Sequence, residues 1–194
     1  MVQLSRNAQV LRYLIQVAPG SGHTKLAKFA YLADLEARRY TGRPISRFRY
    51  KLFPYGPFPG KPFFAARDEL TRHGYAVEAT VPSGSYSCQE LSPTASVPEY
   101  DFSVAEAQLL AWVAESYMAL TARELCDDVV YQTEPMKKRK LNVGEELPMD
   151  SMNKKPGDEL GFSLERMLAG EASAKAGRTR PVAEALRELR DRAV

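Results

Sequence analysis

The chain has 194 residues, of which 44% are hydrophobic and 26% charged, a composition typical of a globular protein that buries a core without disulfides or metal. No apolar run approaches the roughly 18 residues of a membrane span, and no secretory signal is visible, so we expect a cytoplasmic protein without membrane contact. Cys88 and Cys126 are isolated from each other, which predicts free thiols and no metal site.

The net charge of +3 conceals an uneven distribution of charge along the chain. Residues 1–75 contain 13 Lys/Arg and 4 Asp/Glu, whereas residues 76–150 contain 5 Lys/Arg and 13 Asp/Glu. This division predicts one basic and one acidic surface. Either the two surfaces partly neutralise each other in the folded protein, or the basic surface meets an acidic partner or nucleic acid.

Two amphipathic helices are predicted first, over residues 7–18 and 24–40, because apolar side chains recur there at helical spacing. Asn7 is placed to cap the first helix, and Gly42 stands where the second needs a left-handed residue at its end. The basic residues of the second helix are expected mostly on its solvated surface: Lys25, Lys28, Arg38 and Arg39.

Residues 47–53 alternate basic and apolar side chains, which predicts a strand with its aromatic residues in the core and its cations in solvent. Residues 54–60 contain three prolines and two glycines. We expect them to form a stiff, irregular loop that exposes its aromatic side chains, because proline lacks a hydrogen-bond donor and glycine relaxes φ.

A helix over residues 61–73 and a hairpin over residues 75–91 follow, an order that resembles the back half of a winged helix without implying DNA binding. Ser103 and Thr121 each precede a glutamate by three residues, which is the capping-box spacing and predicts two further helix starts. Residues 136–160 are expected to be irregular.

Residues 151–194 are predicted to form a C-terminal extension that includes a helix over residues 181–192. Leu186 and Leu189 belong to the apolar stripe of that helix. The helix either docks into a groove of a partner or packs on its own domain. Together these elements predict an α+β fold: a mostly helical single domain over residues 1–150, with a small antiparallel sheet, a wing-like hairpin and a C-terminal helical tail.

The sequence contains no recognisable pattern of catalytic or cofactor-binding residues. His23 and His73 are its two histidines, and neither has a Cys, Asp or Glu at metal-ligand spacing. A nucleophile elbow, a phosphate-binding loop and a dinucleotide fingerprint are all missing. We therefore expect no cofactor, no metal and no enzymatic activity, while an enzyme with an unrecognised site stays an alternative.

Three short motifs together resemble the Panacea domain, the SocA-like antitoxin family of bacterial and phage toxin–antitoxin systems. They are Lys25-Leu26-x-Lys28-x-x-Tyr31-x-x-Asp34, Gly42-Arg43-Pro44, and Tyr55-Gly56-Pro57. The similarity covers about residues 8–150. It implies an antitoxin that neutralises a cognate protein toxin by direct binding, in one described case as an adaptor that delivers the toxin for degradation. A His and a Trp common in the family are replaced by Tyr131 and Met136, so no role of that His is carried over.

Within this signature, the proline-rich turn is the segment that we expect to contact a partner, through Tyr55, Pro57 and Phe58. Exposed aromatic side chains fixed by proline lose little entropy on binding. The alternative is that Tyr55 and Phe58 fill the core of the domain itself. Arg47 and Arg49 are the basic side chains expected to join the contact. A second hypothesis is a DNA-binding autoregulator of its own operon, acting through the basic N-terminal half.

Overall fold

The computed structural model of the chain describes residues 3–83, 86–137 and 141–149. They fall within the first of two compact units, which runs from Met1 to Lys155. Leu186 and Leu189, with the helix predicted around them, lie outside the described residues, and the extension over residues 151–194 stays a prediction.

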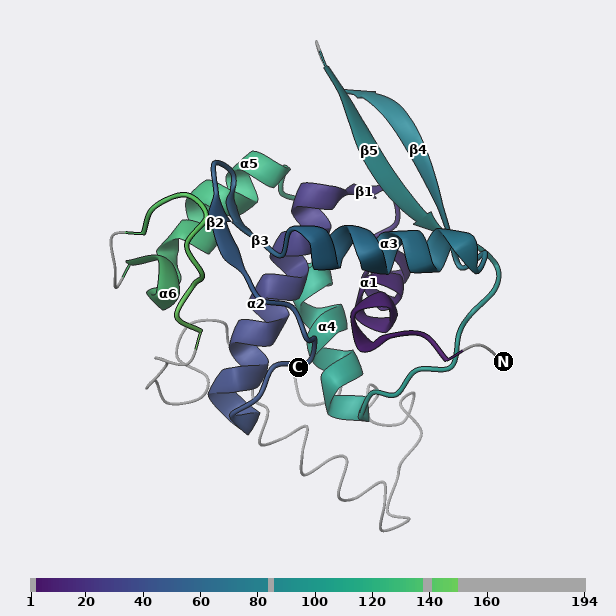
Figure 1. Cartoon of the computed structure of the whole chain (residues 1–194), viewed down its shortest axis with the longest axis horizontal. Coiled ribbons are helices and arrows are strands. Elements are labelled where there is room, and N and C mark those ends of the chain that lie inside the picture. The colour runs from purple at the N-terminus through teal and green to yellow at the C-terminus, as the bar shows by residue number, and fades with distance from the viewer. Residues whose placement is uncertain (1–2, 84–85, 138–140, 150–194) are drawn as a thin grey trace, which may run out of the picture. The chain divides into compact units, whose positions relative to one another are not determined.

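The described part is an α+β fold that is mostly helical, as the sequence predicted (Figure 1). Its regular helices are α1 (Arg6–Val17), α2 (His23–Thr41), α3 (Lys61–Arg72), α4 (Val104–Tyr117), α5 (Ala122–Glu124) and α6 (Glu134–Lys137). A π-helical segment, η1 (Leu125–Val129), and a 3₁₀ turn, η2 (Val130–Gln132), join α5 to α6. The strands are β1 (Ser21–Gly22), β2 (Lys51–Phe53), β3 (Gly56–Phe58), β4 (Ala76–Ser83) and β5 (Tyr86–Pro93).

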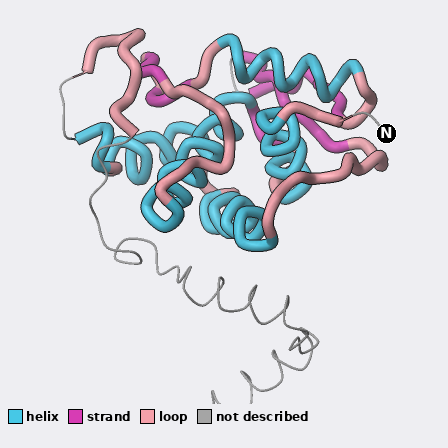
Figure 2. Tube along the Cα trace, turned by 60° about the horizontal axis from the view of Figure 1, so that its bottom comes forward, coloured by secondary structure: helices cyan, strands magenta, loops and turns pink. Residues whose placement is uncertain are grey.

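The strands form two separate antiparallel sheets. One has three strands in the order β1-β5-β4, and the other is the hairpin β2-β3. The two sheets lie near the two ends of α3, which connects them in the chain (Figures 1 and 2). The predicted wing-like hairpin is confirmed as β4–β5. Within the described residues, no helix has the length and apolar character to cross a membrane.

Helix α2 packs against α1, α4 and β3, and its middle is almost entirely buried. The prediction that its basic residues lie mostly in solvent is therefore wrong for Lys28, which is 1% exposed, and Arg38 and Arg39 are half-buried. The helix ends as expected at Gly42, which has φ of 73° and donates its N–H to Arg38. Glycine adopts this left-handed conformation without steric cost.

Helix α1 is capped by Ser5, so the prediction of Asn7 as its cap is wrong. The Ser5 hydroxyl accepts from the N–H of Ala8 at 3.3 Å, and Ser5 itself donates twice to the carboxylate of Glu69. Asn7 has a different role, because its side-chain oxygen accepts from the N–H of Arg47 at 2.8 Å. That bond ties α1 to the segment that follows α2.

A buried carboxylate fixes the segment that follows α2. Asp34 is 1% exposed and accepts hydrogen bonds from the N–H of Ser46 at 2.7 Å, from the Ser46 hydroxyl, and from the Tyr50 hydroxyl at 2.7 Å. Burial raises the pKa of Asp34, and the bonds from Ser46 and Tyr50 oppose that rise. A buried carboxylate without such donors is costly, so this arrangement strongly favours one path for the chain.

The segment after Ser46 alternates as predicted, with Phe48 and Tyr50 buried and Arg47 and Arg49 exposed. Its regular strand is shorter than expected, however, because β3 pairs only with Lys51–Phe53. The prediction of an irregular loop over residues 54–60 is wrong at β3.

Proline is compatible with β3 because of the register of the hairpin. Pro57 opposes Leu52, whose N–H and C=O point away from β3 and bond to Glu145 and Gly144 at 2.9 and 2.7 Å. A residue opposite such a position needs no N–H for the ladder.

Both predicted capping boxes are present, at Ser103 with Glu106 and at Thr121 with Glu124. The first starts the 14-residue helix α4. The second starts only the three residues of α5, after which the chain continues as η1. The local cap was therefore predictable, whereas the wider π-helical turn behind it was not.

We predict that Asp34→Ala lowers the free energy of unfolding by about 3 kcal/mol or more, because three buried donors lose their acceptor. Tyr50→Phe removes one of the three bonds and should cost about 2 kcal/mol. Urea unfolding monitored by circular dichroism measures both. Asp68→Ala, at an exposed position, is the control and should stay within about 0.5 kcal/mol of wild type. A cost for Asp34→Ala as small as that of the control would contradict this role.

Candidate partner-binding site

The buried side chain of Lys28 supports the turn between β2 and β3 from the interior of the domain. The Lys28 Nζ donates to the carbonyl oxygen of Pro57 at 2.5 Å. Its carbon chain passes Gly56, whose φ of 80° requires glycine. Burial lowers the pKa of Lys28 to about 8, and the nearby Cys126 opposes that shift. A buried ammonium with a backbone acceptor therefore lies under the turn.

Two further side chains bond to carbonyl oxygens of the same turn. The Sγ of Cys126, in η1, donates to Tyr55 at 3.4 Å, and the hydroxyl of Tyr131, in η2, donates to Pro54 at 3.5 Å. The donors come from segments more than 70 residues further along the chain. Together with Lys28, they restrict the conformation of the turn through three of its carbonyl oxygens.

The side chain of Tyr55 is 76% exposed at the tip of this turn, which makes it the most exposed large apolar side chain in the described part. Pro57 is buried and Phe58 is half-buried. The ring of Phe58 packs against the rings of Phe63 and Phe64, with centroids 5.2 and 5.7 Å away. Of the three predicted contact residues in the turn, the structure thus presents Tyr55 to solvent and packs the other two against the domain.

A pocket of about 700 Å³ lies beside the turn, between it and the start of α5 and η1. Tyr55 and Tyr131 line it with Cys126, and Arg123 and Asp127 form an exposed ion pair there with N and O 3.6 Å apart. Such an exposed pair contributes little to stability. The pocket has the size to accept an apolar side chain from another molecule.

The other predicted contact residues lie on the segment that leads to the turn. Arg47 and Arg49 are both exposed, and neither side chain makes an ion pair or hydrogen bond within the described residues. Lys51 is exposed on the same segment. We call Arg47, Arg49 and Lys51 the basic ridge.

The remaining titratable side chains do not form a catalytic constellation in the described part. No group of three His, Cys, Asp or Glu there could hold a metal ion. Asp127 and Asp128 are exposed, as a solvated helix face predicts. His23 lies 2.7 Å from the carboxylate of Glu78, and burial lowers its pKa against the effect of that carboxylate.

The model of the family described as "Antitoxin SocA-like, Panacea domain" matches residues 26–134, which is more than half of the chain. The chain belongs to the SocA-like antitoxin family and carries a Panacea domain. Comparison with curated proteins and with solved structures found no match.

The signature residues of this Panacea domain are mainly structural. Lys28 bonds to the turn, Tyr31 bonds to Thr133 with the two hydroxyl oxygens 2.8 Å apart, and Asp34 holds the segment after α2. Lys25, which is half-buried, donates to the carbonyl oxygen of Met118. Their spacing of three residues directs each to a different neighbouring segment.

The other signature residues lie where the chain turns or meets solvent. Gly42 and Gly56 have positive φ, Pro44 is half-buried and Arg43 is exposed. No pattern in the sequence indicates that Cys126 supports the turn. The resemblance identifies Tyr131 as the counterpart of the family His, but its bond to the turn depends on tertiary structure.

We predict that the stability conferred by Lys28 rises with pH. Its pKa is about 8 in the folded protein and 10.5 ordinarily, so between these values the unfolded chain binds the proton that the folded chain has lost. The unfolding free energy therefore increases with pH over this interval. Urea unfolding of wild type and Lys28→Met should show a stability difference that shifts in favour of wild type by about 2 kcal/mol between pH 7.5 and 10.

Lys61→Met is the control for this measurement, because Lys61 is exposed. Its stability difference from wild type should stay constant over the same range of pH. A constant difference for Lys28→Met as well would contradict a depressed pKa in the folded protein.

Proposed function

We propose that this Panacea domain is an antitoxin that neutralises a cognate protein toxin by direct binding, with Tyr55 at the centre of the contact. The observation that carries this proposal is the exposure of Tyr55, at 76%, on a turn held by three side-chain donors. Tyrosine is enriched among residues that dominate binding energy. A turn that is already ordered loses little conformational entropy when it binds, so more of the contact energy appears as affinity.

The adjacent pocket supports the same proposal. It lies directly beside Tyr55 and has a volume of about 700 Å³, enough for one large apolar side chain of the toxin. A side chain that projects outward next to a pocket allows reciprocal contact, in which each partner inserts a group into the other. Lys28 and Asp34, two charged residues of α2, are both only 1% exposed and so are out of reach of a substrate, which favours binding over catalysis here.

A DNA-binding autoregulator of its own operon is the second candidate function. The exposed cations of the basic ridge favour it. The wing-like hairpin β4–β5 weighs against it, because residues 76–93 contain two glutamates and no lysine or arginine. We expect no complex with duplex DNA from upstream of the gene at 150 mM salt in a gel-shift assay, and a stable complex there would favour the autoregulator instead.

Co-expression with the product of the adjacent gene tests the function itself. We expect that product to arrest growth when expressed alone and growth to recover when this protein is co-expressed. The level of the toxin during recovery separates simple sequestration, which leaves it unchanged, from delivery to a protease, which lowers it. If the neighbouring product is harmless, or remains toxic beside this protein, the antitoxin proposal is wrong.

We predict that Tyr55→Ala weakens binding of the purified toxin by about thirtyfold or more, the loss of a hot-spot side chain of about 2 kcal/mol. Isothermal titration calorimetry measures the affinity. Tyr55→Phe keeps the ring and should retain most of it. Val97→Ala removes another exposed apolar side chain, 58% exposed, and should change the affinity less than twofold. Equal effects of Tyr55→Ala and Val97→Ala would exclude Tyr55 as the central contact.

A further inference from the structure

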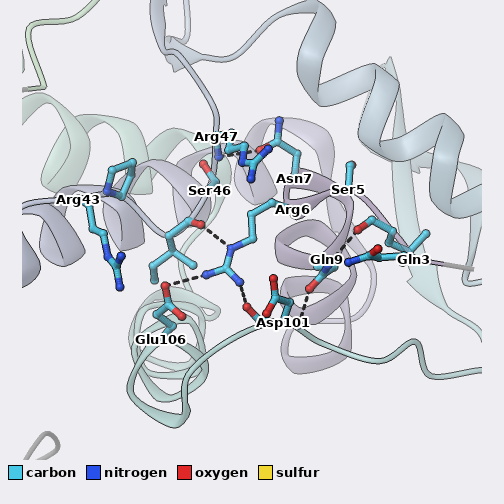
Figure 3. A pocket seen from close by; sticks show the side chains of 13 residues that line it. Gln3, Ser5, Arg6, Asn7, Gln9, Arg43, Ser46, Arg47, Asp101 and Glu106 are labelled. Carbon is cyan, nitrogen blue, oxygen red and sulfur yellow. Dashed lines mark hydrogen bonds and ion pairs between the residues drawn. The ribbon is translucent and has the colours of Figure 1, made fainter.

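A second pocket, of about 710 Å³, lies where the start of α1 meets the segment after α2 and the start of α4 (Figure 3). Three arginines line it: Arg6, Arg43 and Arg47. Two carboxylates, Asp101 and Glu106, line it as well. The pocket shares no lining residue with the pocket beside Tyr55.

The side chain of Arg6 holds the wall of the pocket together through hydrogen bonds. Its guanidinium donates to the carbonyl oxygen of Ile45 at 2.8 Å, to the carbonyl oxygen of Asp101, and to the carboxylate of Glu106 at 2.7 Å. The charge of Arg6 is therefore largely balanced by Glu106. Figure 3 shows these bonds converging on one guanidinium, which joins the three segments around the pocket.

The side chains of Arg43 and Arg47, in contrast, do not hold the pocket together. Both are exposed, and neither guanidinium makes an ion pair or hydrogen bond to any described residue. The backbone of Arg47 is nevertheless fixed, because its N–H donates to Asn7 at 2.8 Å. Asp101 is the remaining carboxylate of the lining, and Figure 3 shows it on the other side of the Arg6 guanidinium from Arg43 and Arg47. The wall of the pocket formed by Arg43 and Arg47 is thus basic, and its guanidinium groups are available to bind an anionic group.

The basic ridge extends this wall away from the pocket. Arg47, Arg49 and Lys51 occupy alternate positions of an extended segment, and the intervening Phe48 and Tyr50 are turned into the core. Alternate residues of an extended chain are about 6.6 Å apart. The ridge continues through β2 into the turn that carries Tyr55, so the pocket, the ridge and the aromatic tip belong to one continuous segment of the chain.

We infer that the basic wall of this pocket and the basic ridge bind an acidic, extended segment of the toxin. This inference rests on the proposed function and names the chemistry of the partner. An extended peptide with Asp or Glu at alternate positions repeats its carboxylates at the same distance as the ridge repeats its cations. Arginine binds a carboxylate through two parallel N–H bonds, and Arg43 and Arg47 at the pocket have guanidinium groups free for that geometry.

The structure favours a protein segment over nucleic acid as the occupant. Proteins that bind single strands stack successive bases on several exposed rings. In the turn beyond the ridge, the ring of Phe53 packs edge to face against Phe58, with centroids 5.9 Å apart. Tyr55 is the ring of this turn that is largely exposed and could stack on a base. The hairpin β4–β5 would also offer no cation to the phosphates of duplex DNA, because residues 76–93 contain no lysine or arginine.

The test compares two double variants of the full chain with equal changes in net charge. Arg47→Gln/Arg49→Gln alters the ridge, and Arg72→Gln/Lys137→Gln removes two exposed cations elsewhere. At about 50 mM salt, where a Debye length above 10 Å exaggerates surface charge, we expect the ridge variant to bind the purified toxin about tenfold more weakly than wild type. The control should lose less than twofold. Both should keep the melting temperature of wild type, because all four side chains are exposed.

A reversal of charge makes the test specific for carboxylates. Arg47→Glu/Arg49→Glu should abolish binding at low salt, and lysines substituted for the acidic residues of the matching toxin segment should restore it. If wild type binds the toxin and the ridge variant matches the control, the inference about the ridge is wrong while the antitoxin function stands. If wild type does not bind the toxin, both fail. If the ridge variant loses affinity only for a single-stranded or duplex oligonucleotide, the ridge binds nucleic acid and the inference is overturned.

Discussion

The fold depends on a row of buried polar side chains along α2. Lys28, Tyr31 and Asp34 follow one another at intervals of three residues, and each step turns the side-chain direction back by about 60° around the helix axis. The three therefore reach three different parts of the chain: the β2–β3 turn, the end of η2 and the segment after α2. A buried polar group is costly unless it is paired, so each bond strongly favours one position of the segment it holds. A single helix in this way sets the relative placement of segments that are distant in sequence.

This arrangement relates the scaffold to the proposed contact surface. The segment fixed by Asp34 becomes the basic ridge, and the turn fixed by Lys28 presents Tyr55. The side chains of both surfaces are exposed, yet the segments that carry them are held by buried hydrogen bonds. The entropy of ordering them is therefore lost when the protein folds and is not lost again when a partner binds. The same physical reason accounts for the burial of most of the residues that resemble the motif of the family.

Local patterns in the sequence predict the structural features that depend only on residues close together in the chain. The long helices α1 to α4, the glycine stop of α2 and the capping boxes at Ser103 and Thr121 all follow from such patterns, and the structure confirms them. The burial of Lys28 could not be read in this way, because helical periodicity assigns a charged side chain to solvent and its acceptor lies 29 residues away. Similarly, Tyr55 and Phe58 belong to one short segment but differ in exposure. Phe58 packs against rings of α3, a tertiary contact that the local sequence does not show.

The bonds that hold the β2–β3 turn all end on main-chain carbonyl oxygens, those of Pro54, Tyr55 and Pro57. Every amino acid carries such an oxygen, so the support of the tip does not depend on the side chain displayed there. A substitution at position 55 can replace the displayed group while Lys28, Cys126 and their bonds stay as they are. The side chain at the tip can therefore change without a change in the buried residues that hold the turn.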